Sequence, residues 1–114
     1  MRILELFSGT GSIGNIFRRN GHEVISVDLD GRFGAEIQED ILIFNYARLE
    51  TPDFIWASPD CREYNRAKTI GVRKLDYADS LVAKTLEIIR YFEKLNPRLL
   101  WMIENGDSTL LWEL

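Results

Sequence analysis

A glycine-rich turn near the amino terminus is the part of this sequence best suited to bind a ligand. Residues Phe7–Gly11 follow the apolar run Ile3–Leu6 directly and lead into Ser12–Asn20, whose apolar residues have helical spacing. Glycine lets a ligand approach the backbone closely, where N–H groups at a helix start bind polar groups. The pattern predicts a nucleotide-type cofactor site after a first strand. A tight turn without a ligand is the alternative, since neither a complete dinucleotide motif nor a phosphate-binding loop is present.

Two carboxylates stand where an adenosine-type cofactor would need them. Asp28 lies at the carboxyl end of a second predicted strand, Glu23–Val27, and a carboxylate there can accept hydrogen bonds from both ribose hydroxyls. Asp40 can accept from an adenine amino group while Ile41 packs on the ring. Each carboxylate also has a structural alternative, because Asp28 can cap the following loop and Asp40 can be the N-cap of the next helix.

Cys61 and Glu104 could carry covalent and acid–base chemistry. Cys61 lies after an apolar run, in a loop rich in basic residues, and nearby positive charge favours the nucleophilic thiolate. A small core residue is the alternative for a lone cysteine. Glu104 and Asn105 follow another apolar run, where a partly desolvated carboxyl would have a raised pKa and could donate a proton. A strand-terminal turn is the alternative there.

All of these residues fall at the ends of predicted strands. We expect strands at Met1–Leu6, Glu23–Val27, Ala35–Gln38, Phe54–Ala57 and Leu99–Ile103, helices at Ser12–Asn20, Ile41–Leu49 and Tyr77–Leu95, and a polar loop from Ser58 to about Asp76. Alternating strands and helices imply a doubly wound α/β domain with a mostly parallel sheet of about five strands. Ligands of such sheets bind beyond the carboxyl ends of the strands, so we expect the polar clusters to converge there.

Size and composition restrict the class of protein. The chain has 114 residues, enough for one domain over residues 1–114, and 46% are hydrophobic, which suffices for an ordinary core. The sequence begins without a signal pattern, and its apolar runs are too short to span a bilayer, so we expect an intracellular protein that has no membrane partner. One cysteine and one histidine exclude an intrachain disulfide and argue against a zinc cluster, so no metal is expected.

The charge distribution bears on nucleic-acid binding. The net charge of −4 is unusual for a protein that holds nucleic acid by itself. A short stretch after Cys61 is nevertheless basic and could meet phosphate, with a solvated surface loop as the alternative. Its basic residues are Arg62, Arg66, Lys68, Arg73 and Lys74.

Taken together and in this order, these segments resemble the motifs of the DNA cytosine-5 methyltransferase family, particularly its short phage or viral members. The matching segments, which span essentially the whole chain, are Glu5–Gly11 (Glu-Leu-Phe-Ser-Gly-Thr-Gly), Asp28, Asp40-Ile41, Pro59-Asp60-Cys61 and Glu104-Asn105. The resemblance implies a Rossmann-like methyltransferase fold, S-adenosylmethionine as cofactor, DNA as partner, and methyl transfer to C5 of cytosine.

The resemblance also implies a role for each residue. Cys61 would attack C6 of a flipped-out cytosine, and Glu104, with Asn105 beside it, would bind the N3 and amino edge of the base. The turn after the first strand would hold the methionine part of the cofactor, Asp28 its ribose, and Asp40 with Ile41 its adenine. The implied cofactor contacts are Phe7, Ser8, Gly9, Thr10, Gly11, Asp28, Leu29, Asp40, Ile41, Ser58 and Pro59.

The sequence departs from the family pattern in two places. Asp60 replaces the second proline of the family's Pro-Pro-Cys motif, and its carboxylate would oppose thiolate formation. Gly106-Asp107 follows Glu104-Asn105, and the family's later recognition region has no counterpart. Three hypotheses therefore stand: a small or truncated DNA methyltransferase, a cofactor-binding module without turnover that needs a second chain or a second copy for DNA recognition, and another α/β enzyme such as a nicotinamide-dependent one.

Overall fold

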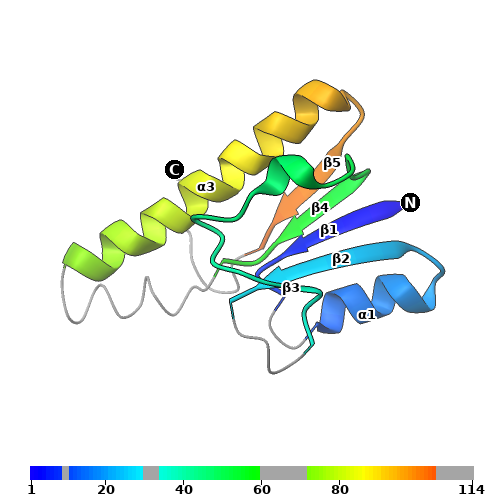
Figure 1. Ribbon diagram of the computed structural model, residues 1–114, viewed down its shortest axis with the longest axis horizontal. Coiled ribbons are helices and arrows are strands. Elements are labelled where there is room, and N and C mark those ends of the chain that lie inside the picture. Colours follow the sequence, from blue (N-terminus) through cyan, green and yellow to red (C-terminus); the bar gives the residue numbers. More distant parts are fainter. Residues whose placement is uncertain (9–10, 30–33, 60–71, 105–114) are drawn as a thin grey trace.

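Five parallel strands form a single sheet (Figure 1). The computed structural model describes residues 1–8, 11–29, 34–59 and 72–104. The strands are β1 (Arg2–Leu6), β2 (Glu23–Asp28), β3 (Ile37–Gln38), β4 (Phe54–Ala57) and β5 (Leu100–Ile103), and they lie in the order β3-β2-β1-β4-β5. All four neighbouring pairs are parallel. The predicted parallel α/β sheet is confirmed.

Helices α1 (Ser12–Arg19) and α3 (Val72–Leu95) cover opposite faces of this sheet. Successive side chains of a strand point to opposite faces, and β1 shows the division clearly. Glu5 accepts a hydrogen bond from Gly14 of α1, whereas Leu4 and Leu6 join the apolar core that contains Phe92 of α3. Figure 1 shows the two helices on either side of the stacked strands. The predicted doubly wound arrangement is therefore present.

The side chains that α3 buries explain why this helix could be predicted from the helical spacing of its apolar residues. Ile88, Ile89 and Phe92 of α3 are almost completely buried and belong to one cluster with Leu6 and Ile55 of the sheet. Burying such a side chain contributes about 1.5–3 kcal/mol relative to leaving it exposed, so the apolar face fixes the helix against the strands. The helix begins at Val72, however, so the predicted polar loop reaching about Asp76 is too long.

The segment between β3 and β4 differs from the prediction. In place of a helix over Ile41–Leu49, the chain forms a turn followed by the short 3-10 helix η2 (Tyr46–Arg48). Ile41 and Phe44 are both buried in the core. Apolar residues three positions apart satisfy a tight turn as well as a helix, so their spacing did not distinguish the two. Apart from the start of α3, the other predicted strand and helix bounds agree with the structure within two residues.

The strand order reverses between β1 and β4. From β1 the chain proceeds to β2 and β3 on one side, whereas β4 and β5 lie on the other. In an open parallel sheet, a crevice for ligands forms outside the carboxyl ends of the strands at such a reversal. We call this edge of the sheet, formed by the residues that follow β1, β2, β4 and β5, the carboxyl rim. Among the described residues, no helix combines the length and apolar character needed to span a membrane.

Candidate functional site

The turn that follows β1 lies at the centre of the carboxyl rim and has an unusual backbone conformation. Phe7 has a φ of +59°, in the left-handed region that residues other than glycine rarely adopt. The Ser8 N–H donates to the Val27 carbonyl of β2 at 3.2 Å, and the Gly11 N–H donates back to the Ser8 carbonyl at 2.8 Å. Gly11, with φ +78°, then starts α1. Strained backbone of this kind concentrates at functional sites, which makes the turn a candidate for ligand contact.

The Ser8 hydroxyl supports the same interpretation. Its oxygen is buried and has no hydrogen-bond partner among the described residues. Leaving a buried polar group unpaired costs about 1–3 kcal/mol, so buried groups of this kind normally have a partner. A polar group of a ligand seated in the turn would provide that partner. This orphaned oxygen is the structural observation that fits a cofactor at the turn.

Residues after β4 and β5 extend the rim on the other side of the turn. The Ser58 N–H donates to the Leu6 carbonyl at 3.3 Å, and the Glu104 N–H donates to the Ala57 carbonyl at 2.8 Å. These bonds continue the ladder beyond the strand ends and bring two polar side chains together. The Ser58 hydroxyl donates to Glu104 Oε2 at 3.4 Å, and the Glu104 side chain is exposed. A carboxylate is therefore presented to solvent at the rim, two strands away from the turn.

The side of the rim near β2 holds the remaining predicted contacts. Asp28 ends β2 and is half-buried, and Leu29 after it is 62% exposed. Asp40 Oδ1 accepts a hydrogen bond from the Leu42 N–H at 2.9 Å, so it caps a turn and not the helix that the sequence offered as an alternative. Ile41 is buried in the core beneath α3. Asp28 and Leu29 thus lie on the rim, whereas Asp40 and Ile41 have structural tasks of their own.

Behind the turn, a buried carboxyl joins β1 to α1. Glu5 is 2% exposed, and its Oε2 accepts a hydrogen bond from the Gly14 N–H at 3.1 Å, while Oε1 has no partner among the described residues. Burial raises the pKa of Glu5 above its ordinary value, more than the Gly14 hydrogen bond and the Arg18 charge lower it. A Cβ at position 14 would stand 2.4 Å from Glu5 Oε1. Glycine at this position therefore lets α1 approach the strand closely.

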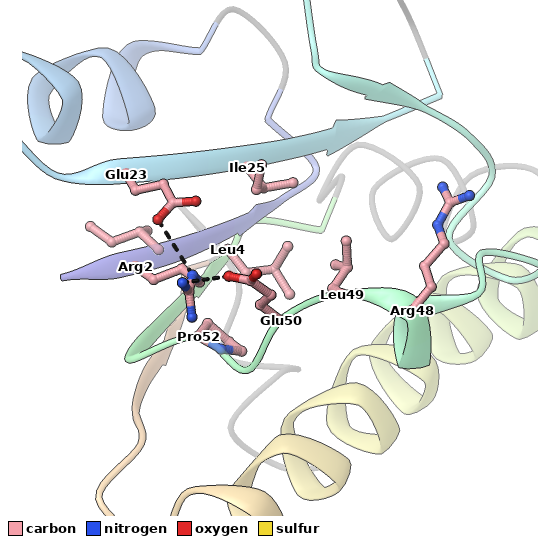
Figure 2. A pocket seen from close by; sticks show the side chains of 9 residues that line it. Arg2, Leu4, Glu23, Ile25, Arg48, Leu49, Glu50 and Pro52 are labelled. Atoms are coloured by element: carbon pink, nitrogen blue, oxygen red, sulfur yellow. Dashed lines mark ion pairs between the residues drawn. The ribbon is translucent and has the colours of Figure 1, made fainter.

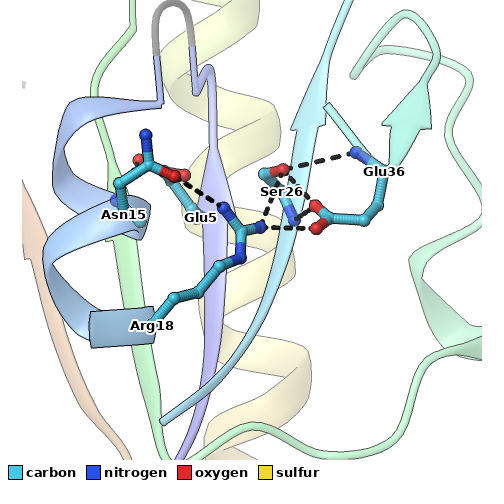
Figure 3. Close-up of polar contacts among 6 residues, drawn as sticks. Glu5, Asn15, Arg18, Ser26 and Glu36 are labelled. Carbon is cyan, nitrogen blue, oxygen red and sulfur yellow. Dashed lines mark hydrogen bonds and ion pairs between the residues drawn. The ribbon is translucent and has the colours of Figure 1, made fainter. Parts of the chain in front are cut away.

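A polar network next to this carboxyl connects α1 with β2 and the segment before β3 (Figure 3). Arg18 donates to Glu36 Oε1 at 2.5 Å and to Asn15 Oδ1 at 3.2 Å. Glu36 also accepts from the Ser26 N–H at 2.9 Å and from the Ser26 hydroxyl. Burial acts to raise the pKa of Glu36, but the Ser26 hydrogen bonds and the Arg18 charge outweigh it and the pKa is lowered. The network fixes the position of α1, and with it the end of the turn.

A cavity of about 280 Å³ lies at the opposite end of the strands (Figure 2). Three of its charged side chains pair with one another, because Arg2 contacts Glu23 at 3.4 Å and also Glu50. The apolar part of its wall comes from Leu4, Ile25, Leu49 and Pro52, among others. The cavity is at the amino ends of β1 and β2 and is therefore separate from the rim. Within the described ranges, no group of three or more His, Cys, Asp or Glu side chains could hold a metal ion.

The chain is similar to known proteins both in sequence and in fold. No protein-family model matches the chain. A protein of Frog virus 3 (isolate Goorha) named "Probable DNA (cytosine-5)-methyltransferase" is 31% identical over 121 residues, which cover 95% of this chain and 55% of the viral protein. The crystal structure of a protein from Lactobacillus casei matches with a TM-score of 0.54 and 22% identity, over 90% of this chain and 47% of the other. The chain thus spans about half the length of each of these proteins.

The structure brings part of the predicted site together. At one rim, Phe7 and Ser8 follow β1, Asp28 ends β2, Ser58 follows β4 and Glu104 follows β5. Pro59 follows Ser58 and is buried. The predicted residues that lie outside the described part of the chain are Gly9, Thr10, Cys61, Arg62, Arg66, Lys68 and Asn105. Arg73 and Lys74 belong to the amino-terminal part of α3.

Four residues that support the site were not among the predicted contacts. Glu5 and Gly14 hold α1 against β1, and Arg18 and Glu36 hold it against β2. The sequence did contain one signal for them, because a carboxylate in the middle of an apolar strand needs a buried partner. The partner itself was not identifiable, since Gly14 contributes only its backbone N–H.

Proposed function

We propose that this chain is the cofactor-binding part of an S-adenosylmethionine-dependent DNA cytosine-5 methyltransferase. The observation that carries the proposal is the meeting of the strained turn at Phe7–Ser8 with Asp28 and Glu104 along one rim. These are residues that the family resemblance assigns to the cofactor and the target base. The viral relative, similar over 95% of this chain, supports the same assignment through its name.

The residues at the rim suit S-adenosylmethionine. The buried Ser8 hydroxyl, which has no partner among the described residues, and the backbone of the turn would receive the methionine part, and Asp28 would accept hydrogen bonds from the ribose hydroxyls. Leu29, largely exposed beside Asp28, offers an apolar surface to the nucleoside. When bound, this cofactor supplies an electrophilic methyl group. The chain's own task is to orient it and to make cytosine C5 nucleophilic.

Activation of the base falls to Cys61 and Glu104. Addition of the Cys61 thiolate to C6 forms a covalent bond and moves electron density to C5, which is otherwise a poor nucleophile. Glu104, exposed at the rim and hydrogen-bonded by Ser58, would accept a hydrogen bond from the amino group and, as the carboxylic acid, would donate its proton to N3, so that the ring stays neutral as the thiolate adds. Once C5 carries the methyl group, loss of the C5 proton to water lets the Cys61 thiolate leave C6 and restores the ring. A flipped-out cytosine is required, because neither side chain can reach these atoms within a stacked duplex.

Radiolabelled methyl transfer to cytosine-containing DNA tests this function. In C61S we expect at least about 100-fold less transfer, since a hydroxyl is a far weaker nucleophile than a thiolate. Cofactor affinity, measured by calorimetry on the same protein, should stay within about twofold because the thiol contacts the base and not the cofactor. The exposed-site variant L95A, at the carboxyl end of α3 and therefore near the amino end of β5, serves as the control and should retain full transfer. Unchanged transfer in C61S would remove the covalent mechanism.

A cofactor-binding module without turnover is the second candidate, and Asp60 is the observation that favours it. A carboxylate next to the nucleophile raises the free energy of the thiolate through like-charge repulsion. Such a module would bind the cofactor and yet transfer no methyl group to DNA. The variant D60P, which restores the family's proline, separates the two cases: it should increase transfer if the chain is an enzyme and leave transfer absent if it is a module.

A further inference from the structure

Three side chains on the face of the sheet that α1 covers form one polar cluster (Figure 3). We call it the Arg18 clamp, and it consists of Arg18, Ser26 and Glu36. Glu36 accepts hydrogen bonds from the Ser26 N–H at 2.9 Å and from the Ser26 hydroxyl, and its own N–H donates to Ser26 Oγ at 3.3 Å. Arg18 donates to both partners, at 2.5 Å to Glu36 Oε1 and at 3.5 Å to Ser26 Oγ. The clamp thus joins α1, β2 and the segment that leads into β3.

Within the clamp, the Glu36 side chain does the work of a strand backbone. The two residues of β3 pair with the end of β2, and one position earlier the register sets Glu36 opposite Ser26. There the Ser26 N–H donates to the Glu36 carboxylate and not to a backbone carbonyl. Because this acceptor is charged and has two oxygens, it can bind the Arg18 guanidinium at the same time. The pairing of β2 with its neighbour is therefore linked directly to α1.

The clamp lies next to the residue that we assign to the cofactor ribose. Successive strand residues alternate between the two faces of a sheet, so Asp28 lies on the α1 face together with Ser26, two residues before it. The backbone of Asp28 is held by the sheet itself, because Asp28 ends β2 and pairs with Gln38 of β3. The position of this carboxylate therefore does not depend on where α1 lies.

The turn assigned to the methionine part of the cofactor depends on α1 instead, because it ends where this helix begins. Separate contacts hold α1 on the three central strands. The Gly14 N–H donates to Glu5 of β1, and the Phe17 ring lies 5.8 Å, between centroids, from the Phe54 ring of β4. Arg18, about one helical turn after Gly14, makes the polar attachment on the β2 side. Arg18 therefore helps to set where the turn stands relative to β2.

We propose that Arg18 is a positioning residue that fixes the separation between the two halves of the cofactor site, the turn at Phe7–Ser8 and Asp28. The inference rests on the proposed function and adds to it a residue that acts through α1 and not through a contact with the ligand. Two contacts made by one ligand reinforce each other only when their separation matches that of the ligand's own groups. Arg18 therefore contributes to the affinity for the whole cofactor and not to the affinity for its nucleoside half alone.

Calorimetric titration of the full chain with two compounds tests this role. S-adenosylhomocysteine spans both halves of the site, whereas 5′-methylthioadenosine contains the nucleoside and lacks the amino-acid part. The variant R18M keeps an apolar stem and removes the charge and the hydrogen bonds of the clamp. We expect it to weaken S-adenosylhomocysteine binding at least about tenfold and to change 5′-methylthioadenosine binding by less than about twofold. A general loss of stability would not change the ratio of the two affinities.

Two control variants separate positioning from charge and from stability. R19M removes the same charge from the next residue of α1, which is exposed, and should leave both affinities unchanged. I88V removes a buried methyl group from α3, on the opposite face of the sheet, so it lowers stability without touching the clamp. It should also bind both compounds as the wild-type chain does. Urea unfolding of each variant verifies that it is folded under the conditions of the titration.

A double-mutant cycle tests whether Arg18 acts through Glu36. E36Q removes the charge that Arg18 binds and should weaken S-adenosylhomocysteine binding by about threefold or more. In R18M/E36Q the affinity should stay within about twofold of that of R18M, because both substitutions break the same contact. If the two losses multiply instead, Arg18 and Glu36 act separately and the clamp is not the cause.

Two results of the titration with R18M would overturn the proposal while the proposed function stands. Equal weakening of both compounds would mean that Arg18 supports Asp28 or the whole fold, and unchanged affinity for both would mean that it has no positioning role. In either case the wild-type chain still binds the cofactor. A wild-type chain that binds neither compound would refute the cofactor site itself, and this inference with it.

Discussion

Replacing Gly14 by alanine should destabilise the fold, although the same change stabilises most helices. Gly14 lies within α1 directly over Glu5, and an added Cβ would stand 2.4 Å from Glu5 Oε1, 3.2 Å from its Cδ and 3.4 Å from Val24 Cγ1. The first distance is far below any normal contact. Glu5 cannot easily move aside, because it is 2% exposed and is held by the Gly14 N–H. Either the helix or the carboxyl must therefore shift.

The expected change in the free energy of unfolding follows from one stabilising and two destabilising contributions. Alanine gains about 1 kcal/mol over glycine in helix propensity. Overpacking a buried site costs about 1–3 kcal/mol, and losing a hydrogen bond to a charged acceptor costs about 1.5–3 kcal/mol. We expect G14A to lower the free energy of unfolding by about 2–4 kcal/mol, a large part of the stability of a small domain.

Urea unfolding followed by circular dichroism measures this change, and a double-mutant cycle isolates its cause. In an E5A background the clash and the hydrogen bond are both absent, so G14A should be neutral or stabilising by up to about 1 kcal/mol. If G14A is neutral in the wild-type background, or equally costly in E5A, the close contact between α1 and β1 is not the cause and the reasoning is wrong.

Four further predictions concern stability. Because burial raises the pKa of Glu5, the native state retains a proton that the unfolded chain loses above about pH 4.5, so this group makes stability fall as pH rises through that window, and E5Q should flatten the fall. The lowered pKa of Glu36 acts in the opposite sense: its contribution is present above pH 4.5 and is lost on acidification, so E36Q should reduce the acid sensitivity of the urea midpoint. F92A should cost about 3–5 kcal/mol, since Phe92 is fully buried, whereas L95A, on the same helix but 56% exposed, should cost less than about 1 kcal/mol. S8A should stabilise the ligand-free protein by about 1–3 kcal/mol in urea unfolding, because it removes a buried hydroxyl that has no partner among the described residues, and should lower cofactor affinity.

Much of the fold could be predicted because buried parallel strands have a simple signature. Short apolar runs such as Phe54–Ala57, each bounded by polar or turn-forming residues, indicated four of the strands almost to the residue. The buried apolar residues of α3 recur with helical spacing. Gly11 and Gly21 flank α1, and both have the positive φ angles that favour glycine. From these elements the topology followed, and with it the expectation that Phe7 and Glu104 share a rim.

The remaining features depend on contacts that local sequence does not encode. The segment after Asp40 forms a turn and a 3-10 helix because Ile41 and Phe44 reach the core from a short connection, an outcome set by the sheet and α3. The link between Arg18 and Glu36 joins residues from different elements, and nothing near either residue indicates the other. The exposure of Trp101 was equally hidden, since an apolar run has the same pattern in an inner strand and at an edge.

Calorimetric titration with S-adenosylhomocysteine, the demethylated form of the cofactor, tests the central claim most directly. The account predicts one site per chain whose affinity falls at least about tenfold in D28A, which removes the acceptor for the ribose hydroxyls at the carboxyl rim. E50A, which removes an exposed carboxylate at the opposite end of the strands, should leave the affinity unchanged. Absence of binding, or an equal loss in D28A and E50A, would contradict a cofactor site at this rim.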